Sequence, residues 1–308
     1  MPSRRHRFLK NKKKVTKRKY SIGLAISLLA IGLIAVVWNI NTNFWKNNSK
    51  ISVLVHKSDD SVLVSVFDHK LGQIINILIP SNTQVEAAGG LGIWKLGSLW
   101  ELGKKEKMGG QLLIGSVRRT FKFPISRWAD YQALGYSDSN LKNLLLANFT
   151  SYSSDLTFSE KIALLIFSSG VKNPNRIEIN LADTQLLKKG TLTDGEEGFL
   201  VSKVSSPKIL SYFGDDYVAN GSYKVAIFDL GAGTEISEGV GDIVQVMGAK
   251  VTSLSKSDIS EKSCLIKGKD KRAVKNIANI LSCKISEGVL SSGVDIEINL
   301  GTGFKEIY

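Results

Sequence analysis

The stretch Ile74-Ile-Asn-Ile-Leu-Ile-Pro-Ser-Asn-Thr83 decides the fold of the first half of this 308-residue chain. Five of its first six residues are apolar, which predicts a strand with both faces buried. Pro80 ends that strand, because proline has no N–H to donate and its ring fixes the backbone. The sequence therefore predicts a buried strand that runs directly into a turn at Ser81 and Asn82.

The segments on either side of this strand complete a mixed domain. Residues 51–56 and 61–67 alternate between apolar and polar side chains around a polar turn, which predicts a β-hairpin. Residues 111–121 place apolar side chains on one helical face, and a capping box, Thr157-x-x-Glu160, opens another apolar helix. We therefore expect residues 50–217 to form one α/β or α+β domain.

A smaller unit is expected in residues 222–308, after a polar segment at 214–221. The patterns predict strands at 224–228, 250–254, 264–267 and 294–300, and helices at 235–247 and 271–281. This gives the order β-α-β-β-α-β, in which two helices cover one sheet.

The net charge of +13 comes from the N-terminus. Residues 1–50 hold 12 Lys and Arg and no acid, so the remaining 258 residues carry 29 basic against 28 acidic groups. This nearly neutral outer region argues against nucleic-acid binding, which needs basic side chains gathered on a folded surface.

Residues 20–45 contain no charged side chain, and Tyr20 and Trp38 flank their apolar run. About 20 apolar residues cross a bilayer, so we expect residues 20–45 to contain a transmembrane helix and the start of a polar spacer, with residues 1–19 as a basic cytoplasmic tail. The chain would then be a single-pass protein of the cytoplasmic membrane, with residues 46–308 extracytoplasmic and the lipid bilayer as a partner. A cleaved signal peptide is the alternative, but its apolar region is shorter and ends in small residues.

Two cysteines, Cys264 and Cys283, lie in the outer region, where disulfides form. Cys264 begins a predicted strand, and Cys283 follows the next predicted helix, which runs back to the start of that strand. We therefore predict a disulfide between them, with two free buried thiols as the alternative.

Other common reaction centres are absent from the sequence. Gly231-Ala-Gly233 lacks the third glycine of a dinucleotide-binding loop, and there is no phosphate-binding P-loop. His56 and His69, the only outer histidines, are 13 residues apart, and no C-x-x-C or H-x-x-x-H occurs. We therefore assign no metal ligand and no catalytic residue.

Several motifs resemble those of the LytR-CpsA-Psr family. Residues 77–83 are similar to its strand and Pro-Arg-Asp-Thr signature, residues 95–100 to its Lys-Ile-Asn-Ala-Ala-Tyr, and residues 109–125 to its Gly-Gly helix and Ile-Pro segment. In the second unit, the segments that resemble the LytR C-terminal domain are residues 225–234, 244–251 and 295–301. The resemblance implies a membrane-anchored enzyme that uses Mg²⁺ to transfer glycopolymers from polyprenyl-pyrophosphate carriers to the cell wall.

This sequence departs from the family pattern at the reaction centre that the resemblance implies. Ser81 stands in place of the signature Arg and Asn82 in place of the signature Asp, whereas Lys95 keeps its place. Pyrophosphate binding needs fixed cations, and Mg²⁺ needs carboxylate oxygens. We therefore expect Ser81, Asn82 and Lys95 to form either a degenerate pyrophosphate-lipid site or a plain turn, and we expect no bound cofactor.

The resulting hypothesis is a cell-envelope protein that binds or scaffolds near the cell wall without catalysis. Its partner would be a cell-wall glycopolymer or a polyprenyl-phosphate lipid. The enzymatic alternative is an active phosphotransferase with an unusual centre, which would use Mg²⁺. A second alternative is a membrane anchor with a regulatory or secretion role, in which the basic tail contacts a cytoplasmic partner.

Overall fold

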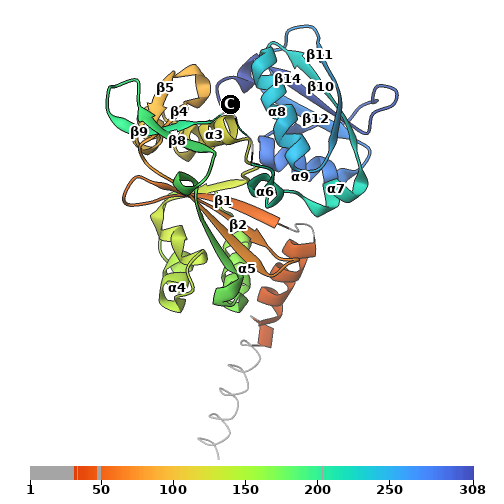
Figure 1. Cartoon of the computed structure of the whole chain (residues 1–308). Coiled ribbons are helices and arrows are strands. Elements are labelled where there is room, and N and C mark those ends of the chain that lie inside the picture. Colours follow the sequence, from red (N-terminus) through yellow and green to blue (C-terminus); the bar gives the residue numbers. More distant parts are fainter. Residues whose placement is uncertain (1–30, 33, 47–49, 203, 205) are drawn as a thin grey trace, which may run out of the picture.

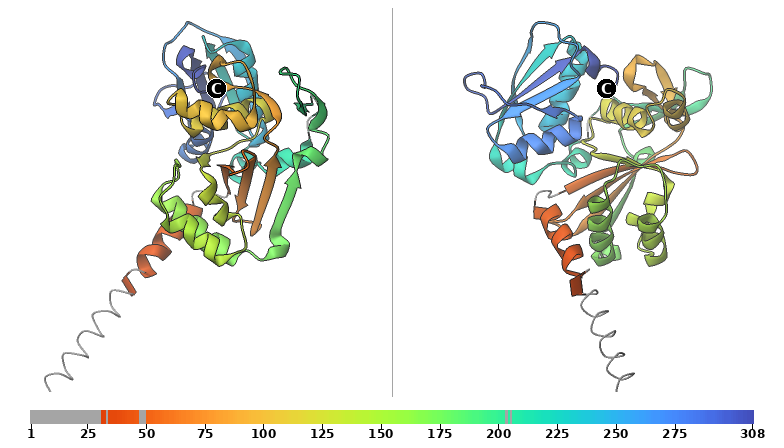
Figure 2. Two further views of the ribbon diagram at one scale, coloured as in Figure 1. Left: turned by 90° about the vertical axis from the view of Figure 1, so that its left-hand side faces the viewer. Right: turned by 180° about the vertical axis from the view of Figure 1, so that it is seen from behind.

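Two units that combine helices and sheets follow one another along the chain (Figure 1). The computed structural model describes residues 31–308 apart from 33, 47–49, 203 and 205. Sheets of five and four strands belong to the first unit, and another five-stranded sheet belongs to the second. Figure 2 shows the two units from further sides. The mixed α/β class expected from the sequence is confirmed.

The first described residues are helical. Residues 31–46, apart from 33, form a helix that extends away from both units (Figures 1 and 2). Among the described residues, no helix has the length and apolarity that crossing a bilayer requires. The first eleven residues of the predicted transmembrane segment, 20–45, lie outside the described part of the chain.

The central sheet of the first unit has the strand order β6-β1-β2-β3-β7. Its strands are β1 (Lys50–His56), β2 (Val62–Asp68), β3 (Gln73–Ile79), β6 (Arg127–Ala129) and β7 (Arg176–Asn180). β1, β2 and β3 are antiparallel neighbours, with Ile51 opposite Phe67 and Val66 opposite Ile75. β6 and β7 pair in parallel at the two edges. The predicted hairpin and the predicted buried strand are both confirmed.

The two faces of this sheet contribute to separate cores, because successive side chains of a strand point to opposite sides. Val53 of β1 packs in one core with α4 (Leu141–Phe149) and α5 (Phe158–Gly170). Leu54, the next residue, packs in the other core with α3 (Gly110–Phe121). The sheet is therefore covered on both faces, which explains why β3 is apolar along nearly its whole length.

A smaller sheet, ordered β5-β4-β9-β8, continues from the end of β3. Its strands are β4 (Thr83–Glu86), β5 (Ile93–Lys95), β8 (Leu187–Thr191) and β9 (Glu197–Val201), and α2 (Leu99–Lys105) follows β5. In Figure 1 this sheet lies at the end of the first unit away from the helix formed by residues 31–46.

The second unit has the strand order β11-β10-β14-β12-β13. Its elements are β10 (Lys224–Leu230), α8 (Thr234–Val246), β11 (Lys250–Lys256), β12 (Cys264–Gly268), α9 (Lys271–Leu281), β13 (Lys284–Ile285) and β14 (Ile296–Gly301). The predicted order of strands and helices is present, with the two-residue β13 as an addition. α6 (Pro207–Ser211) and α7 (Asp216–Gly221) precede this unit, and Val218 of α7 packs in its core. The polar segment 214–221 is thus attached to the second unit.

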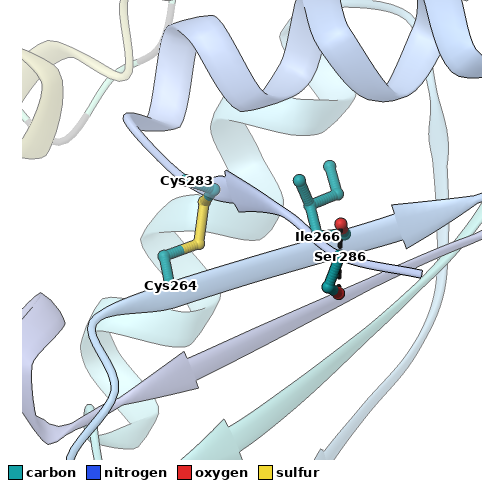
Figure 3. The surroundings of a disulfide bond; sticks show 4 residues. All are labelled: Cys264, Ile266, Cys283 and Ser286. Carbon is teal, nitrogen blue, oxygen red and sulfur yellow. Dashed lines mark hydrogen bonds between the residues drawn. A yellow bond between two sulfur atoms is a disulfide. The ribbon is translucent and has the colours of Figure 1, made fainter. Parts of the chain in front are cut away.

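A disulfide joins Cys264 at the start of β12 to Cys283 just after α9 (Figure 3). Their Cα atoms are 4.7 Å apart. β13 follows directly, and the Ser286 N–H after it donates to the Ile266 carbonyl of β12 at 2.8 Å. The disulfide therefore fixes the chain where α9 returns to its own preceding strand.

Residues 304–308 lie between the two units. Tyr308 is 2% exposed, and its ring stacks on Phe304 with 5.4 Å between centroids. Gly115 of α3 leaves room for this segment, because a Cβ at that position would lie 2.5 Å from the Ile307 carbonyl oxygen. The first and second units are therefore in close contact through this segment.

Candidate functional site

Ser81 and Asn82 occupy the turn between β3 and β4. The Thr83 N–H donates to the Pro80 carbonyl at 3.2 Å, which closes the turn. The Ser81 carbonyl accepts from the Gly97 N–H at 2.9 Å, and Gly97 lies two residues beyond Lys95. The structure therefore brings all three predicted site residues into one neighbourhood.

The backbone carbonyl and the side-chain amide of Asn82 both form hydrogen bonds within the small sheet. Its carbonyl accepts from the Phe199 N–H at 3.0 Å, and its side-chain amide donates to the Glu197 carbonyl at 3.4 Å. The side-chain amide therefore acts as a hydrogen-bond donor within the fold. Asn82 thus contacts the start of β9.

Lys95 does not present a free cation. Its Nζ lies 2.6 Å from Asp194 Oδ2 and also contacts Glu196 Oε2. The hydrogen bonds to Asp194 and then to Glu196 raise the pKa of Lys95, and the bond from Lys95 lowers the pKa of Asp194. One positive and two negative charges leave this group with a charge of −1. A diphosphate would meet net repulsion here.

Asp194 and Glu196 are site residues that the sequence reasoning missed. They lie in the turn between β8 and β9, about a hundred positions from Lys95 in the sequence. The Asp194-Gly195 pair is a common hairpin-turn signal, and Gly195 has a positive φ of 87°. That signal predicts a turn, but it does not indicate which distant lysine the turn will meet.

The five outer arginines are engaged elsewhere in the fold. Arg118 is 5% exposed and donates from Nε and Nη2 to the Ile125 carbonyl at 2.9 and 2.6 Å, and burial lowers its pKa to about 10. The other contacts join Arg127 to Glu160 at 2.8 Å, Arg119 to Glu86 at 2.6 Å, Arg176 to the Ser168 carbonyl at 2.7 Å, and the Arg272 guanidinium to the Tyr217 ring at 4.1 Å. Arg118 and Arg119 belong to α3 and the other three to separate elements, and none of the five has a contact with Lys95 among the described residues.

One hollow does combine cations with carboxylates. It has a volume of about 450 Å³ and is lined by Arg119, Lys122, Glu86 and Glu235, among others. Arg119 Nη2 contacts both carboxylates, at 2.6 Å from Glu86 and 3.2 Å from Glu235. Burial lowers the pKa of Lys122, which has no ion pair among the described residues. The hollow is therefore charge-balanced, with Lys122 as its unpaired cation.

A metal centre is not preformed in the described part of the chain. Across residues 31–308, apart from the undescribed positions, no three His, Cys, Asp or Glu side chains are grouped so that they could hold an ion. Ser81 and Asn82 add no carboxylate, and the two carboxylates at Lys95 are neutralised in part by its ammonium group.

No protein-family model and no curated protein matches this chain. Solved structures do. The chain is similar in structure to LytR-CpsA-Psr proteins. Bacillus subtilis TagV is 14% identical over 50% of this chain and 92% of its own, with a TM-score of 0.39. The LytR-CPS2A-psr family protein YwtF (TagT) with bound octaprenyl pyrophosphate lipid is 14% identical over 51% of this chain and 85% of its own, with a TM-score of 0.38. Because the identities and TM-scores are this low, we assign no functional residue to this chain from the similar structures.

Proposed function

We propose that this chain is a membrane-anchored, extracytoplasmic cell-envelope protein that binds or scaffolds near the cell wall and does not turn over a lipid-linked donor. The observation that supports this proposal is the pair of ionic contacts made by Lys95. The only cation that keeps its place in the sequence motif is held by Asp194 and Glu196. A transferase centre needs preorganised positive charge where phosphate charge develops, and this position supplies the opposite sign.

The location rests on the sequence. The ten-cation segment at residues 4–19 and the uncharged run 20–45 favour a cytoplasmic tail and a membrane anchor. The disulfide between Cys264 and Cys283 is consistent with an oxidising compartment. For residues 222–308 we retain the LytR C-terminal-like assignment as part of this proposal.

The decisive experiment is a transfer assay with the full chain in lipid nanodiscs. The reaction contains a polyprenyl-pyrophosphate-linked glycopolymer, Mg²⁺ and peptidoglycan, and we expect no transferred product. Lys95→Ala is tested beside Lys188→Ala, which removes an exposed lysine of β8. Product formation by the parent chain would overturn the proposal, and loss of that product in Lys95→Ala but not in Lys188→Ala would locate the activity at Lys95.

The hollow at Arg119 and Lys122 supports a second candidate, the active phosphotransferase. Two cations and two carboxylates line this hollow, and one of the cations, Lys122, has no ion pair among the described residues. This candidate predicts that product forms, that Lys122→Ala abolishes it, and that Lys95→Ala leaves it unchanged. The same assay therefore separates the two functions.

A further inference from the structure

Three loops meet at the end of the first unit that lies away from the small sheet. The Asn175 side chain, before β7, donates to the Gly72 carbonyl in the β2–β3 turn at 3.1 Å. Arg176 donates to the Ser137 carbonyl at 2.9 Å, and Ser137 lies in the loop before α4. The β2–β3 turn, the loop before α4 and the α5–β7 loop therefore form one end surface.

The helix of residues 31–46 leaves the unit at this same end. Trp45 stacks on His69 of the β2–β3 turn with 4.6 Å between centroids and contacts the Phe167 ring of α5 at 5.2 Å. In Figure 1 the lower end of α5 lies beside this helix, and α4 lies on the other side of α5. The chain therefore passes from the end surface directly toward the segment that we expect in the membrane.

Large apolar side chains are exposed on this end. Leu71 in the turn and Leu141 at the start of α4 are each 62% exposed, and Leu145 one turn later is 44% exposed. α4 is apolar on its buried side as well, where Leu144 and Ala147 pack in the core. A surface helix normally places its apolar side chains on the buried face, and α4 carries exposed leucines in addition to that face. We therefore expect the exposed leucines of α4 to contact lipid or another protein.

Charges around these leucines favour an anionic surface. Lys142 and Lys172 are exposed and have no ion pair among the described residues. The nearby acid, Asp138, accepts hydrogen bonds from the Asn140 N–H and the Asn143 side chain. Unpaired lysines near a membrane surface are attracted by anionic headgroups.

We propose that this end of the first unit rests on the lipid bilayer. Leu71, Leu141 and Leu145 enter the headgroup boundary, and Lys142 and Lys172 contact anionic headgroups. These five residues are the basal patch. The continuity with the described helix favours lipid over a second protein, because that helix extends from the same end of the molecule. Its Ile31, Ile34 and Trp38 are exposed. The inference depends on the proposed function in one respect: the membrane anchor must hold the bilayer at this end of the unit.

The test uses single cysteines in the full chain, since its only two cysteines are joined in the disulfide. An environment-sensitive fluorophore is attached at Leu71→Cys or Leu141→Cys. Val289→Cys, at a 90% exposed apolar position of the second unit, is the matched control. Each protein is mixed with vesicles that contain phosphatidylglycerol and a lipid-borne quencher, and flotation first shows whether the chain is membrane-bound.

We expect flotation, with strong quenching at positions 71 and 141 and none at 289. If the chain floats but the labels at 71 and 141 are not quenched, the bilayer contact is refuted while the anchor stands. Shielding of these labels only at high protein concentration in detergent would show that a second copy covers the patch, which also refutes the proposal. If the chain does not float, both the anchor and the contact are wrong.

Discussion

At the residue scale, Lys95 shows how a side chain can keep its place in a motif and lose the chemistry of that place. Its ammonium group would be a phosphate ligand if it were free. Instead, the ammonium group forms ion pairs with two carboxylates of the β8–β9 turn. The function of a motif lysine therefore depends on residues about a hundred positions away, which a local motif does not contain.

Asp155 gives a pH-dependent prediction. Burial raises the pKa of its carboxyl from 3.8 to about 6, although Oδ1 accepts from the Trp128 N–H at 2.7 Å. The folded state then holds this proton to a higher pH than the unfolded state does. Its contribution to stability is present below pH 4 and is lost as the pH rises through 6, by about 3 kcal/mol.

The measurement compares urea unfolding of the parent chain and of Asp155→Asn between pH 4 and pH 8. Asparagine keeps the acceptor for Trp128 and stays neutral, so the variant should gain stability relative to the parent as the pH rises. Asp183→Asn, at an exposed position, is the matched control. A parallel pair of pH profiles for Asp155→Asn and the parent would contradict the prediction.

At the element scale, local patterns were sufficient for most long elements. The predicted helix at 271–281 matches α9, and the capping box of Thr157 and Glu160 opens α5 as expected. The small sheet escaped prediction, because β4 and β5 have four and three residues and little periodicity. α4 was also missed, since apolar residues on most of its circumference leave no clear amphipathic pattern.

Replacing Gly115 of α3 by alanine should lower stability, although alanine has the higher helix propensity. An alanine there would place its Cβ 2.5 Å from the Ile307 carbonyl oxygen and 2.9 Å from Ala88 Cβ, so Gly115→Ala should destabilise the chain by about 1 to 3 kcal/mol. In Gly241→Ala of α8 the nearest atom is at 3.5 Å. That control should stabilise the chain by about 0.5 to 1 kcal/mol. Chemical denaturation of both variants checks the pair, and equal signs would refute the argument.

The disulfide gives a prediction for β12 and α9. The cysteines are 19 positions apart, and a loop of this size corresponds to about 3 kcal/mol of stabilisation. We expect the double variant Cys264→Ser/Cys283→Ser to lose about this much stability in chemical denaturation. Maleimide labelling in denaturant should find no thiol before reduction and two after it. Two thiols without reduction would contradict the disulfide.

At the scale of the whole molecule, residues 304–308 connect the units through the buried Tyr308 ring. The Tyr308 hydroxyl oxygen is buried and has no hydrogen-bond partner among the described residues, so Tyr308→Phe should leave stability unchanged or raise it by up to about 1 kcal/mol. Tyr308→Ala should lower stability by about 3 kcal/mol and separate one thermal transition into two. Calorimetry distinguishes these outcomes, and a loss in Tyr308→Phe equal to that in Tyr308→Ala would show that the hydroxyl carries the effect.

The relation between the units could not be predicted from the sequence. Each unit has its own hydrophobic pattern, but the contact of Ile307 with Gly115 joins positions nearly two hundred residues apart. The neighbourhood of Ser81, Asn82 and Lys95 was expected only through the family resemblance. Their partners depend on how β8 and β9 return to β4, which is a property of the tertiary structure.

β3 also acts as a spacer. Its first residue follows the turn that carries Leu71, and its last residue, Ile79, precedes Pro80 and Ser81. Seven residues of strand extend over roughly 20 Å. In the proposed placement on the bilayer, the length of β3 sets the largest distance by which the turn at Pro80 and Ser81 can stand off from the headgroups.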